Sequence, residues 1–344
     1  MPSHNNKVII AAAGSRKTTC LVEEALTILD RNVLITTYTN ENVEQINSYI
    51  VKHHGHIPKN LTVMSWFSFL LQEGVRPYQN RLTSRERIQT INFSSTPNRY
   101  VAKTDIDNYY LTKTGDIYRD RVADFICECN RRSGGMIIKR LESIYGVILI
   151  DELQDLAGYD LNLLEALLRS SIIILAVGDP RQATFSTNNS SKNKQYKKSH
   201  ILEWIKRAKA TGLFVIEERA DCYRSNQIIC DFADALFPDL PKTKSHNMTV
   251  TGHDGIFSIK PHEVSEYIAT HKPQLLRHSV RTKTMGLPAL NIGLAKGRTY
   301  DRVLIFPTEP MKVYWATKNL EKAGDLTKLY VAVTRARYST AFVI

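Results

Sequence analysis

Two carboxylates, Asp151 and Glu152, directly follow a run of four apolar residues, three of which are β-branched (residues 147–150). Such a run is typical of a strand that is buried on both faces of a parallel sheet. Open α/β sheets bind ligands at the carboxyl ends of their strands. At that position Asp151 could hold a Mg²⁺ ion bound to nucleotide phosphates, and Glu152 could orient and deprotonate a water molecule. Taken alone, the segment fits an acidic turn equally well.

A loop of small residues near the N-terminus has the composition of a phosphate-binding loop. Residues 7–19 read Lys-Val-Ile-Ile-Ala-Ala-Ala-Gly-Ser-Arg-Lys-Thr-Thr, which predicts a strand, a loop and a helix over residues 20–29. In a P-loop the backbone N–H groups and the helix N-terminus face the phosphates, so Lys17 would reach the β- and γ-phosphates and Thr18 would coordinate Mg²⁺. The alternative is an ordinary Ser/Thr helix cap. The predicted nucleotide-binding residues of this loop are Ala13, Gly14, Ser15, Arg16, Lys17, Thr18 and Thr19.

Arg16 is the residue of this loop that departs from the usual pattern, because a glycine normally precedes the lysine. Its Cβ crowds a loop that is built for close backbone approach. The side chain could clash with the phosphate cradle, or it could point outward with little strain if φ stays negative. The small residues at positions 11–15 favour the outward arrangement, which predicts slow ATP hydrolysis.

Strands that alternate with helices position these candidate sites. Further buried strands are predicted within residues 32–40, 61–69 and 172–182, with helices beginning near residues 41 and 161. The alternation restarts near residue 213, with strands at residues 213–216, 274–277, 302–306 and 340–344. This rhythm predicts right-handed parallel sheets, so the expected fold class is α/β.

Residues 72–146 interrupt the alternation, because prolines and polar residues replace the apolar runs and Arg131-Arg132-Ser133-Gly134-Gly135 predicts a basic loop. We expect a partly helical insertion in a first domain formed by residues 1–71 and 147–212, followed by a second domain, residues 213–344. The insertion could contact a nucleic-acid backbone or could be only a solvated basic surface. A second polar, basic segment, residues 186–199, is expected to be mobile or to lie on nucleic acid.

The composition is that of a soluble globular protein, with 43% hydrophobic and 23% charged residues among 344. A formal net charge of +12 favours a polyanionic partner. No apolar run is long enough to span a membrane, and residues 1–7 lack a signal-peptide core. The five cysteines match neither a disulfide framework nor a zinc site, so we expect reduced thiols in a cytoplasmic protein that does not associate with membranes.

Four motifs, in this order, resemble those of the UvrD/Rep/PcrA-type superfamily 1 DNA helicases. They are Asp151-Glu152-Leu153-Gln154-Asp155, Val177-Gly178-Asp179-Pro180-Arg181-Gln182, Tyr223-Arg224-Ser225 and Tyr330-Val-Ala-Val-Thr-Arg-Ala-Arg337. The resemblance covers most of the chain outside residues 72–146. It implies two RecA-like P-loop NTPase domains with ATP and Mg²⁺ in the cleft between them, and single-stranded or partly duplex DNA as the partner. The implied activity is DNA-stimulated ATP hydrolysis that drives 3′→5′ translocation or unwinding.

The resemblance also implies roles for individual residues. Thr18 and Asp151 would hold the metal, Glu152 would activate water, and Gln182 would sense the γ-phosphate. Tyr223 would stack on adenine, while Arg224 and Arg335 would act as arginine fingers, which P-loop enzymes need for roughly 10³–10⁵ of their rate. Gly297, in a later motif, joins the predicted ATP-binding residues. The residues expected to contact DNA are Thr37, Tyr38, Thr39, Asn40, Phe67 and Phe185.

Several departures from the family pattern keep two functional hypotheses open. Besides Arg16, no upstream glutamine motif precedes the first strand. The DNA-stacking tryptophan that the family has after Gln182 is missing, and the chain has Phe185 in that segment. Thr299 replaces a ribose-binding glutamate. The large accessory domain is absent between Phe237 and Met285. The first hypothesis is a minimal ATP-dependent single-stranded DNA translocase or helicase. The alternative is a weakly catalytic or non-catalytic nucleic-acid-binding partner of a nuclease, as in antiviral defence systems such as Gabija.

Overall fold

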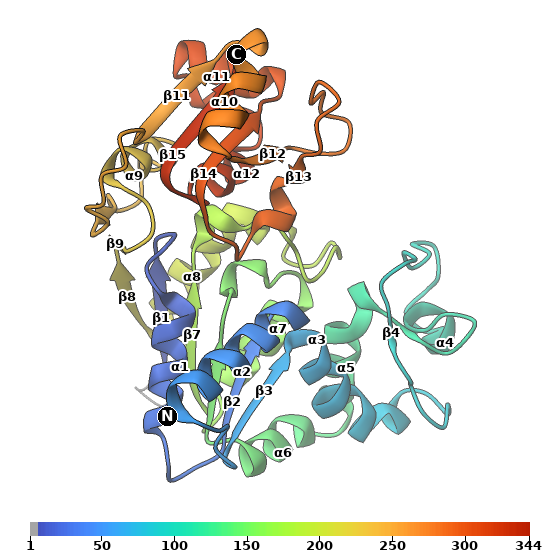
Figure 1. Cartoon of the computed structure of the whole chain (residues 1–344). Coiled ribbons are helices and arrows are strands. Elements are labelled where there is room, and N and C mark those ends of the chain that lie inside the picture. The colour runs from blue at the N-terminus through green and yellow to red at the C-terminus, as the bar shows by residue number, and fades with distance from the viewer. Residues whose placement is uncertain (1–5) are drawn as a thin grey trace. The chain divides into compact units, whose positions relative to one another are not determined.

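The computed structural model describes residues 6–344, so most of the segment expected to lack a signal-peptide core lies outside the described residues. The chain folds into two compact units (Figure 1). The first unit contains the residues up to Ile10, Lys17–Pro180 and Ser186–Glu217. The second unit contains Ala11–Arg16, Arg181–Phe185 and Glu218–Ile344.

A six-stranded sheet forms the centre of the first unit, in the order β3-β2-β6-β7-β1-β8. Its strands are β1 Lys7–Ala11, β2 Val33–Thr37, β3 Leu61–Ser65, β6 Val147–Ile150, β7 Ile173–Gly178 and β8 Val215–Arg219. From β3 to β1 every neighbouring pair is parallel. Every residue of β2 and of β6 is buried, as expected for central strands with both faces covered. The predicted parallel α/β architecture is therefore confirmed.

Helices connect these strands, and two of them begin at a side-chain cap. The helices of this part are α1 Lys17–Thr27, α2 Asn40–His54, α3 Trp66–Phe69, α7 Tyr159–Leu168 and α8 Ile201–Ala210. The hydroxyl of Thr39 accepts a hydrogen bond from the Asn42 N–H at the start of α2, and Gly55 ends that helix with φ +86°. The Ser65 hydroxyl caps α3 in the same way. Each cap therefore lies close to the carboxyl end of a strand, where candidate site residues also lie.

Residues 70–144 form short helices and a small ladder that share the core of the first unit (teal in Figure 1). Their elements are η1 Leu70–Val75, η2 Arg76–Arg81, β4 Ile91–Asn92, α4 Ile106–Tyr110, β5 Ile117–Tyr118, η3 Arg119–Arg121, α5 Val122–Arg132 and α6 Met136–Ile144. Tyr110, Phe125 and Leu141 belong to the same buried cluster as Leu34 and Ile148 of the central strands. The segment that interrupts the alternation is thus packed against the sheet that it interrupts.

A five-stranded parallel sheet forms the centre of the second unit, in the order β11-β15-β14-β12-β13. The strands are β11 Gly255–Ile259, β12 Gln274–Arg277, β13 Leu290–Asn291, β14 Tyr300–Phe306 and β15 Ala336–Val343, and β9 Asp221–Cys222 pairs with β10 Lys244–Ser245 beside them. The helices are α9 Gln227–Asp234, α10 Val264–His271, α11 Glu309–Thr317 and α12 Leu326–Val333. The edge strand β11 was not predicted, because its residues are only partly buried and give no continuous apolar run.

No helix among residues 6–344 has the length and apolar character needed to cross a membrane. All five cysteines are free thiols.

Candidate nucleotide and nucleic-acid sites

The structure brings together Thr18 and Asp151, the two residues predicted from the sequence to be metal ligands. Asp151 immediately follows β6, and its backbone N–H donates to the carbonyl of Thr36 on the adjacent strand at 2.8 Å. Thr18, in the first turn of α1, donates its hydroxyl proton to Asp151 Oδ2 at 2.7 Å. A hydroxyl and a carboxylate side by side form the oxygen donor set that Mg²⁺ prefers in nucleotide sites. These two residues therefore fit the predicted metal, although they come from segments far apart in sequence.

The electrostatics of Asp151 also suit a cation. The residue is 5% exposed, and this burial, together with the nearby charge of Glu152, raises the pKa of the Asp151 carboxyl to about 7. The hydrogen bond from Thr18 opposes the rise, as does the positive charge of Lys17. A buried carboxylate with too little solvation is stabilised by a bound cation, which replaces the lost hydration.

Glu152 is held by a residue whose role the sequence did not reveal. Its backbone has φ +59°, in the left-handed region that non-glycine residues rarely adopt. The Gln154 side-chain NH2 group donates to the Glu152 carboxylate. Its side-chain oxygen, Oε1, accepts a hydrogen bond from the Asp179 N–H at 2.9 Å. A Cβ on Gly178 would lie 2.6 Å from that oxygen, so a larger residue there would displace the Gln154 side chain. Gln154 thus links the β6 and β7 strand ends and orients the predicted catalytic base. The only signal was its place inside a recognised motif.

The first part of the predicted phosphate loop belongs to the second unit. The Tyr223 N–H donates to the Gly14 carbonyl at 2.9 Å, and the Ala13 N–H donates to the Tyr330 hydroxyl at 3.2 Å. Gly14 has φ +77°, and a Cβ there would lie 2.7 Å from Cβ of Arg224, so glycine is required. The hydroxyl of Ser15 is buried without a hydrogen-bond partner in the described structure. A buried polar atom of this kind fits a loop that completes its hydrogen bonds with a phosphate.

The remaining predicted residues of this loop lie in the first unit. Lys17, Thr18 and Thr19 form the first turn of α1, and each is partly exposed. Helix α1 therefore begins three residues earlier than predicted.

Arg16 does not have the backbone conformation on which the low-strain arrangement depended. Its φ is +59°, so the expectation of a negative φ is wrong, and the position keeps the conformation that a glycine would adopt without strain. Its side chain is directed to an aromatic ring, with the guanidinium carbon 4.2 Å from the centroid of Tyr223. The Tyr223 ring also stacks on His246 at 4.8 Å, and His246 Nε2 lies 2.6 Å from Asp221 Oδ1. The predicted adenine-stacking tyrosine is therefore already in contact with an arginine and an imidazole.

The arginine-finger candidates and the predicted phosphate sensor meet in the second unit. Arg335 is 1% exposed and donates from Nη2 to the side-chain oxygen of Gln182 at 2.9 Å. It also donates to the carbonyls of Val331 and Arg298. Arg224 donates to the carbonyl of Thr334, the neighbour of Arg335, at 3.1 Å. Gly297, with φ +82°, is exposed and precedes Arg298 in the chain.

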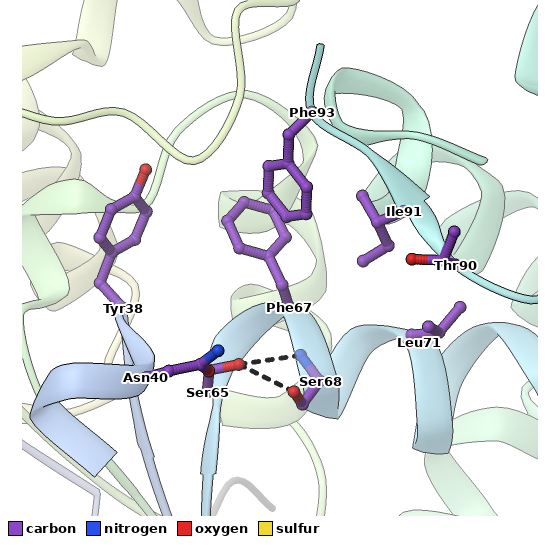
Figure 2. A pocket seen from close by; sticks show the side chains of 9 residues that line it. All are labelled: Tyr38, Asn40, Ser65, Phe67, Ser68, Leu71, Thr90, Ile91 and Phe93. Atoms are coloured by element: carbon purple, nitrogen blue, oxygen red, sulfur yellow. Dashed lines mark hydrogen bonds between the residues drawn. The ribbon is translucent and has the colours of Figure 1, made fainter. Parts of the chain in front are cut away.

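The residues expected to contact DNA separate into different environments. Thr37 is 1% exposed and its hydroxyl accepts from Asn42, and Thr39 caps α2, so both hydroxyls have local partners. Tyr38, Asn40 and Phe67 line an open pocket of about 290 Å³ in the first unit (Figure 2). Phe185 belongs to the second unit, where Lys296 Nζ lies 5.6 Å from the centre of its ring.

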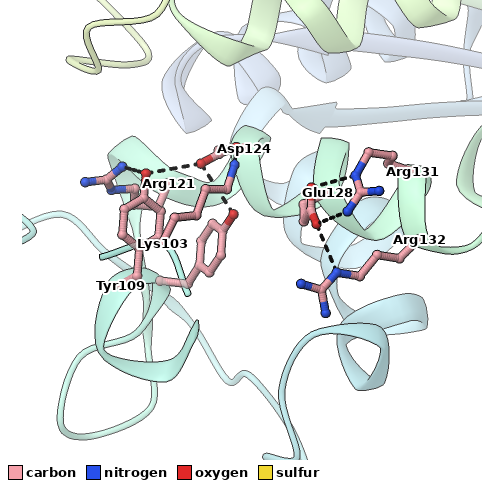
Figure 3. A network of polar contacts seen from close by, with 8 residues as sticks. Lys103, Tyr109, Arg121, Asp124, Glu128, Arg131 and Arg132 are labelled. Atoms are coloured by element: carbon pink, nitrogen blue, oxygen red, sulfur yellow. Dashed lines mark hydrogen bonds and ion pairs between the residues drawn. The ribbon is translucent and has the colours of Figure 1, made fainter. Parts of the chain in front are cut away.

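Arg131 and Arg132 do not form the basic loop that the sequence suggested. They occupy the last turn of α5, and both pair with Glu128, as Figure 3 shows. The hydrogen bond from Arg131, followed by that from Arg132, lowers the pKa of Glu128 to about 2. In the same figure Lys103 pairs with Asp124 at 2.6 Å. These three basic side chains are thus paired with carboxylates of the insertion.

The polar segment 186–199 forms hydrogen bonds with other parts of the first unit. Thr187 donates its hydroxyl proton to the buried Asp160 at 2.7 Å, and its backbone N–H donates to the carbonyl of Asp155. Asn189 donates its N–H to Asp120, and the Asn193 amide donates to the carbonyl of Gly158. These bonds anchor residues 187–193, while contact of the segment with nucleic acid stays a prediction. Sequence composition does not reveal such distant partners.

Comparison with known proteins agrees with this arrangement. The model of the viral superfamily 1 RNA helicase core domain matches residues 107–344, and the model of an AAA domain matches residues 2–188. No curated protein sequence matches the chain.

Two solved structures share the fold. The crystal structure of the Arterivirus nonstructural protein 10 helicase has a TM-score of 0.53 and 14% identity, and covers 98% of this chain. Its complex with DNA has a TM-score of 0.51 and 12% identity, again over 98% of this chain. This chain spans 59% and 61% of those two chains. The comparisons support the superfamily and do not single out its UvrD/Rep/PcrA branch. Because the first family model covers more than half of the sequence, the chain belongs to the viral superfamily 1 RNA helicase core family.

Proposed function

We propose that this chain is an ATP-dependent translocase or helicase that acts on single-stranded nucleic acid. The observation that carries the proposal is the group formed by Thr18, Asp151, Glu152 and Gln154 at the carboxyl ends of the first-unit strands. It combines an oxygen donor pair for Mg²⁺ with a separately oriented carboxylate, which are the parts that phosphoryl transfer to water requires. Mg²⁺, when bound with ATP, would neutralise charge on the phosphates.

The residues of this chain would share the remaining tasks. Lys17 and the N–H groups of the loop bind phosphate, and Glu152 takes a proton from the attacking water. Arg335 and Gln182 already form a hydrogen-bonded pair, so displacement of one side chain would displace the other. Arg335 and Arg224 would stabilise the charge of the transition state. Tyr38 lines a small cavity together with Asp151 and Glu152, which supports coupling between strand binding and hydrolysis.

The identity of the nucleic acid is the finer part of the proposal. The sequence resemblance favoured DNA and 3′→5′ movement, and the related Arterivirus helicase has been solved with DNA. The matching family is described as an RNA helicase core. A net charge of +12 predicts phosphate contacts and an affinity that falls steeply as salt is raised. Both single-stranded DNA and single-stranded RNA therefore belong in the test, as do duplexes with either a 5′ or a 3′ overhang.

The decisive measurement is ATP hydrolysis with and without each single strand. We expect stimulation by at least one of them, and Glu152→Gln should abolish turnover while nucleotide binding remains. Lys17→Ala should weaken nucleotide binding itself. Glu165→Gln is a matched control, because Glu165 on α7 forms a surface ion pair with the exposed Arg169. Wild-type turnover by Glu152→Gln would refute the assignment of the base. Strand binding without any hydrolysis would favour the alternative of a non-catalytic partner subunit.

A further inference from the structure

A phenylalanine of the insertion completes an aromatic row in the first unit. Tyr38 follows β2, Phe67 follows β3, and Phe93 follows β4. The ring centroids of Tyr38 and Phe67 are 6.0 Å apart, and Phe93 meets Phe67 edge to face at 5.0 Å with an interplanar angle of 87°. Figure 2 shows the three rings above Ser65 and Ser68. Phe93 is 56% exposed, although large aromatic side chains usually bury most of their surface.

The pocket beneath these rings combines apolar and polar walls. Besides the rings, Asn40, Ser68 and Thr90 line it with side chains that carry an amide or a hydroxyl group, and the Ser68 hydroxyl also bonds to the Ser65 hydroxyl at 2.9 Å. Asn40, Thr90 and Phe93 are exposed, so a ligand can reach the pocket from solvent. Its volume of about 290 Å³ lies at the lower limit of ligand pockets, which suits one flat ring system better than a longer ligand.

The combination points to a specific chemical class of ligand. A nucleobase has two apolar faces and a polar edge, so it can stack on an aromatic ring while its edge bonds to amide and hydroxyl groups. The pocket also lies at the carboxyl ends of β2 and β3, the side of an open α/β sheet where ligands bind. The segment that carries Phe93 contributes three exposed arginines, Arg85, Arg87 and Arg99, whose charge suits a phosphate backbone.

We propose that this pocket binds one unpaired nucleobase of the nucleic-acid strand, with Phe93 as its stacking surface. The inference rests on the proposed function, because it assumes that a single strand crosses the first unit. Phe93 contributes a face to the base, and Asn40, Ser68 and Thr90 contribute hydrogen bonds to its edge. Stacking makes little distinction among bases, so the pocket tolerates all four. The insertion is thereby part of the strand-binding surface.

The test compares strands with and without bases. Fluorescence anisotropy would measure the affinity of the wild-type chain for a labelled oligothymidylate, a labelled oligouridylate and an abasic strand of equal length. We expect at least one base-bearing strand to bind roughly 10-fold more tightly than the abasic strand, as base–aromatic stacking provides. Phe93→Ala should lose most of that preference, and Phe93→Tyr should retain it. Tyr100→Ala is the matched control, because Tyr100 is an exposed aromatic residue of the insertion that does not line the pocket.

The outcomes separate this inference from the proposed function. Loss of the preference in Phe93→Ala, with retention in Phe93→Tyr and Tyr100→Ala, supports the pocket. If Phe93→Ala keeps the full preference for base-bearing strands, the pocket assignment is overturned while strand binding stands. A wild-type chain that binds neither kind of strand would remove the proposed function and this inference with it. Quenching of the Trp fluorescence that Phe93→Trp adds, on binding of the oligothymidylate but not of the abasic strand, is an independent readout.

Discussion

The two units hold their buried charges in opposite ways. In the first unit the Asp151 carboxylate is buried with few donors, and its pKa is raised because its charge is poorly solvated. In the second unit the buried guanidinium of Arg335 is surrounded by acceptors from Val331, Arg298 and Gln182. The acid therefore gains stability from a cation, whereas the arginine is a charge that its surroundings already support. The first unit therefore favours the binding of a cation near Asp151, whereas the second unit already stabilises the positive charge of Arg335.

The two units also differ in what orients the reactive group. Glu152 accepts a hydrogen bond from the Gln154 side chain and has a left-handed backbone conformation. Arg335 donates to two backbone carbonyls and to the side-chain oxygens of Gln182 and Thr334.

The largest expected effect concerns the arginine of the second unit. Arg335→Ala should lower ATP turnover by roughly 10³–10⁵-fold, the range for loss of an arginine finger. Arg335→Lys should not restore it, because an ammonium cannot span the same set of planar acceptors. Arg337→Ala is the control, since Arg337 is exposed and its guanidinium pairs with Asp301. Steady-state hydrolysis together with a thermal melt would separate catalysis from folding. Turnover of Arg335→Ala within twofold of the wild type would contradict the assignment.

The next effect tests the positioning of the base in the first unit. Gln154→Ala should reduce turnover by roughly 10–100-fold, because a misplaced catalytic group loses its alignment with water. The pH profile of turnover should shift as well, since the Glu152 carboxylate loses a hydrogen-bond donor that stabilises its charged form. Gln79→Ala offers a comparison, because Gln79 is also buried and bonded but lies in η2. An unchanged pH profile in Gln154→Ala would show that it acts only on stability.

A smaller effect concerns how the stability of the first unit changes with pH. Burial raises the pKa of Asp160 to about 6, against the opposing hydrogen bonds from Trp66 and Thr187. Its protonated form is favoured in the folded state, so its contribution to stability is present below pH 4 and is lost as pH rises to about 6. Asp160→Asn should therefore gain stability relative to the wild type over that range. Thermal melts at pH 4 and pH 7 would show the widening difference, and a constant difference would disprove it.

The smallest effect concerns the residue that departs most from the family pattern. Arg16→Gly removes a left-handed arginine and frees a face of Tyr223, so nucleotide affinity should rise about 2–5-fold, the value of an exposed cation–π contact. Arg16→Lys keeps the positive φ but loses the planar group, and it serves as the comparison. Equilibrium titration with a fluorescent ATP analogue would measure both. Loss of hydrolysis in Arg16→Gly would reveal a catalytic role for the arginine.

Local sequence determined the strands that carry the catalytic groups. The predicted strand at residues 147–150 has the same bounds as β6, and that at residues 274–277 has the same bounds as β12. The first is an apolar run that is buried throughout, and the second has two buried leucines between a glutamine and an arginine that are partly exposed; both strands lie in parallel sheets. The positions of Asp151 and Glu152 at a strand end follow directly, because a side chain adjacent to a strand has little freedom to lie elsewhere.

The tertiary structure alone decided which side chains meet. Gln154 reaches the N–H of Asp179, Arg335 reaches Gln182, and Phe93 reaches Phe67, although each pair is separated by more than twenty residues. Hydrophobic periodicity reports which residues face a core, but it carries no information about partners from distant segments. The sequence thus determined where the strands end, and the packing of distant segments determined what lies beside those ends.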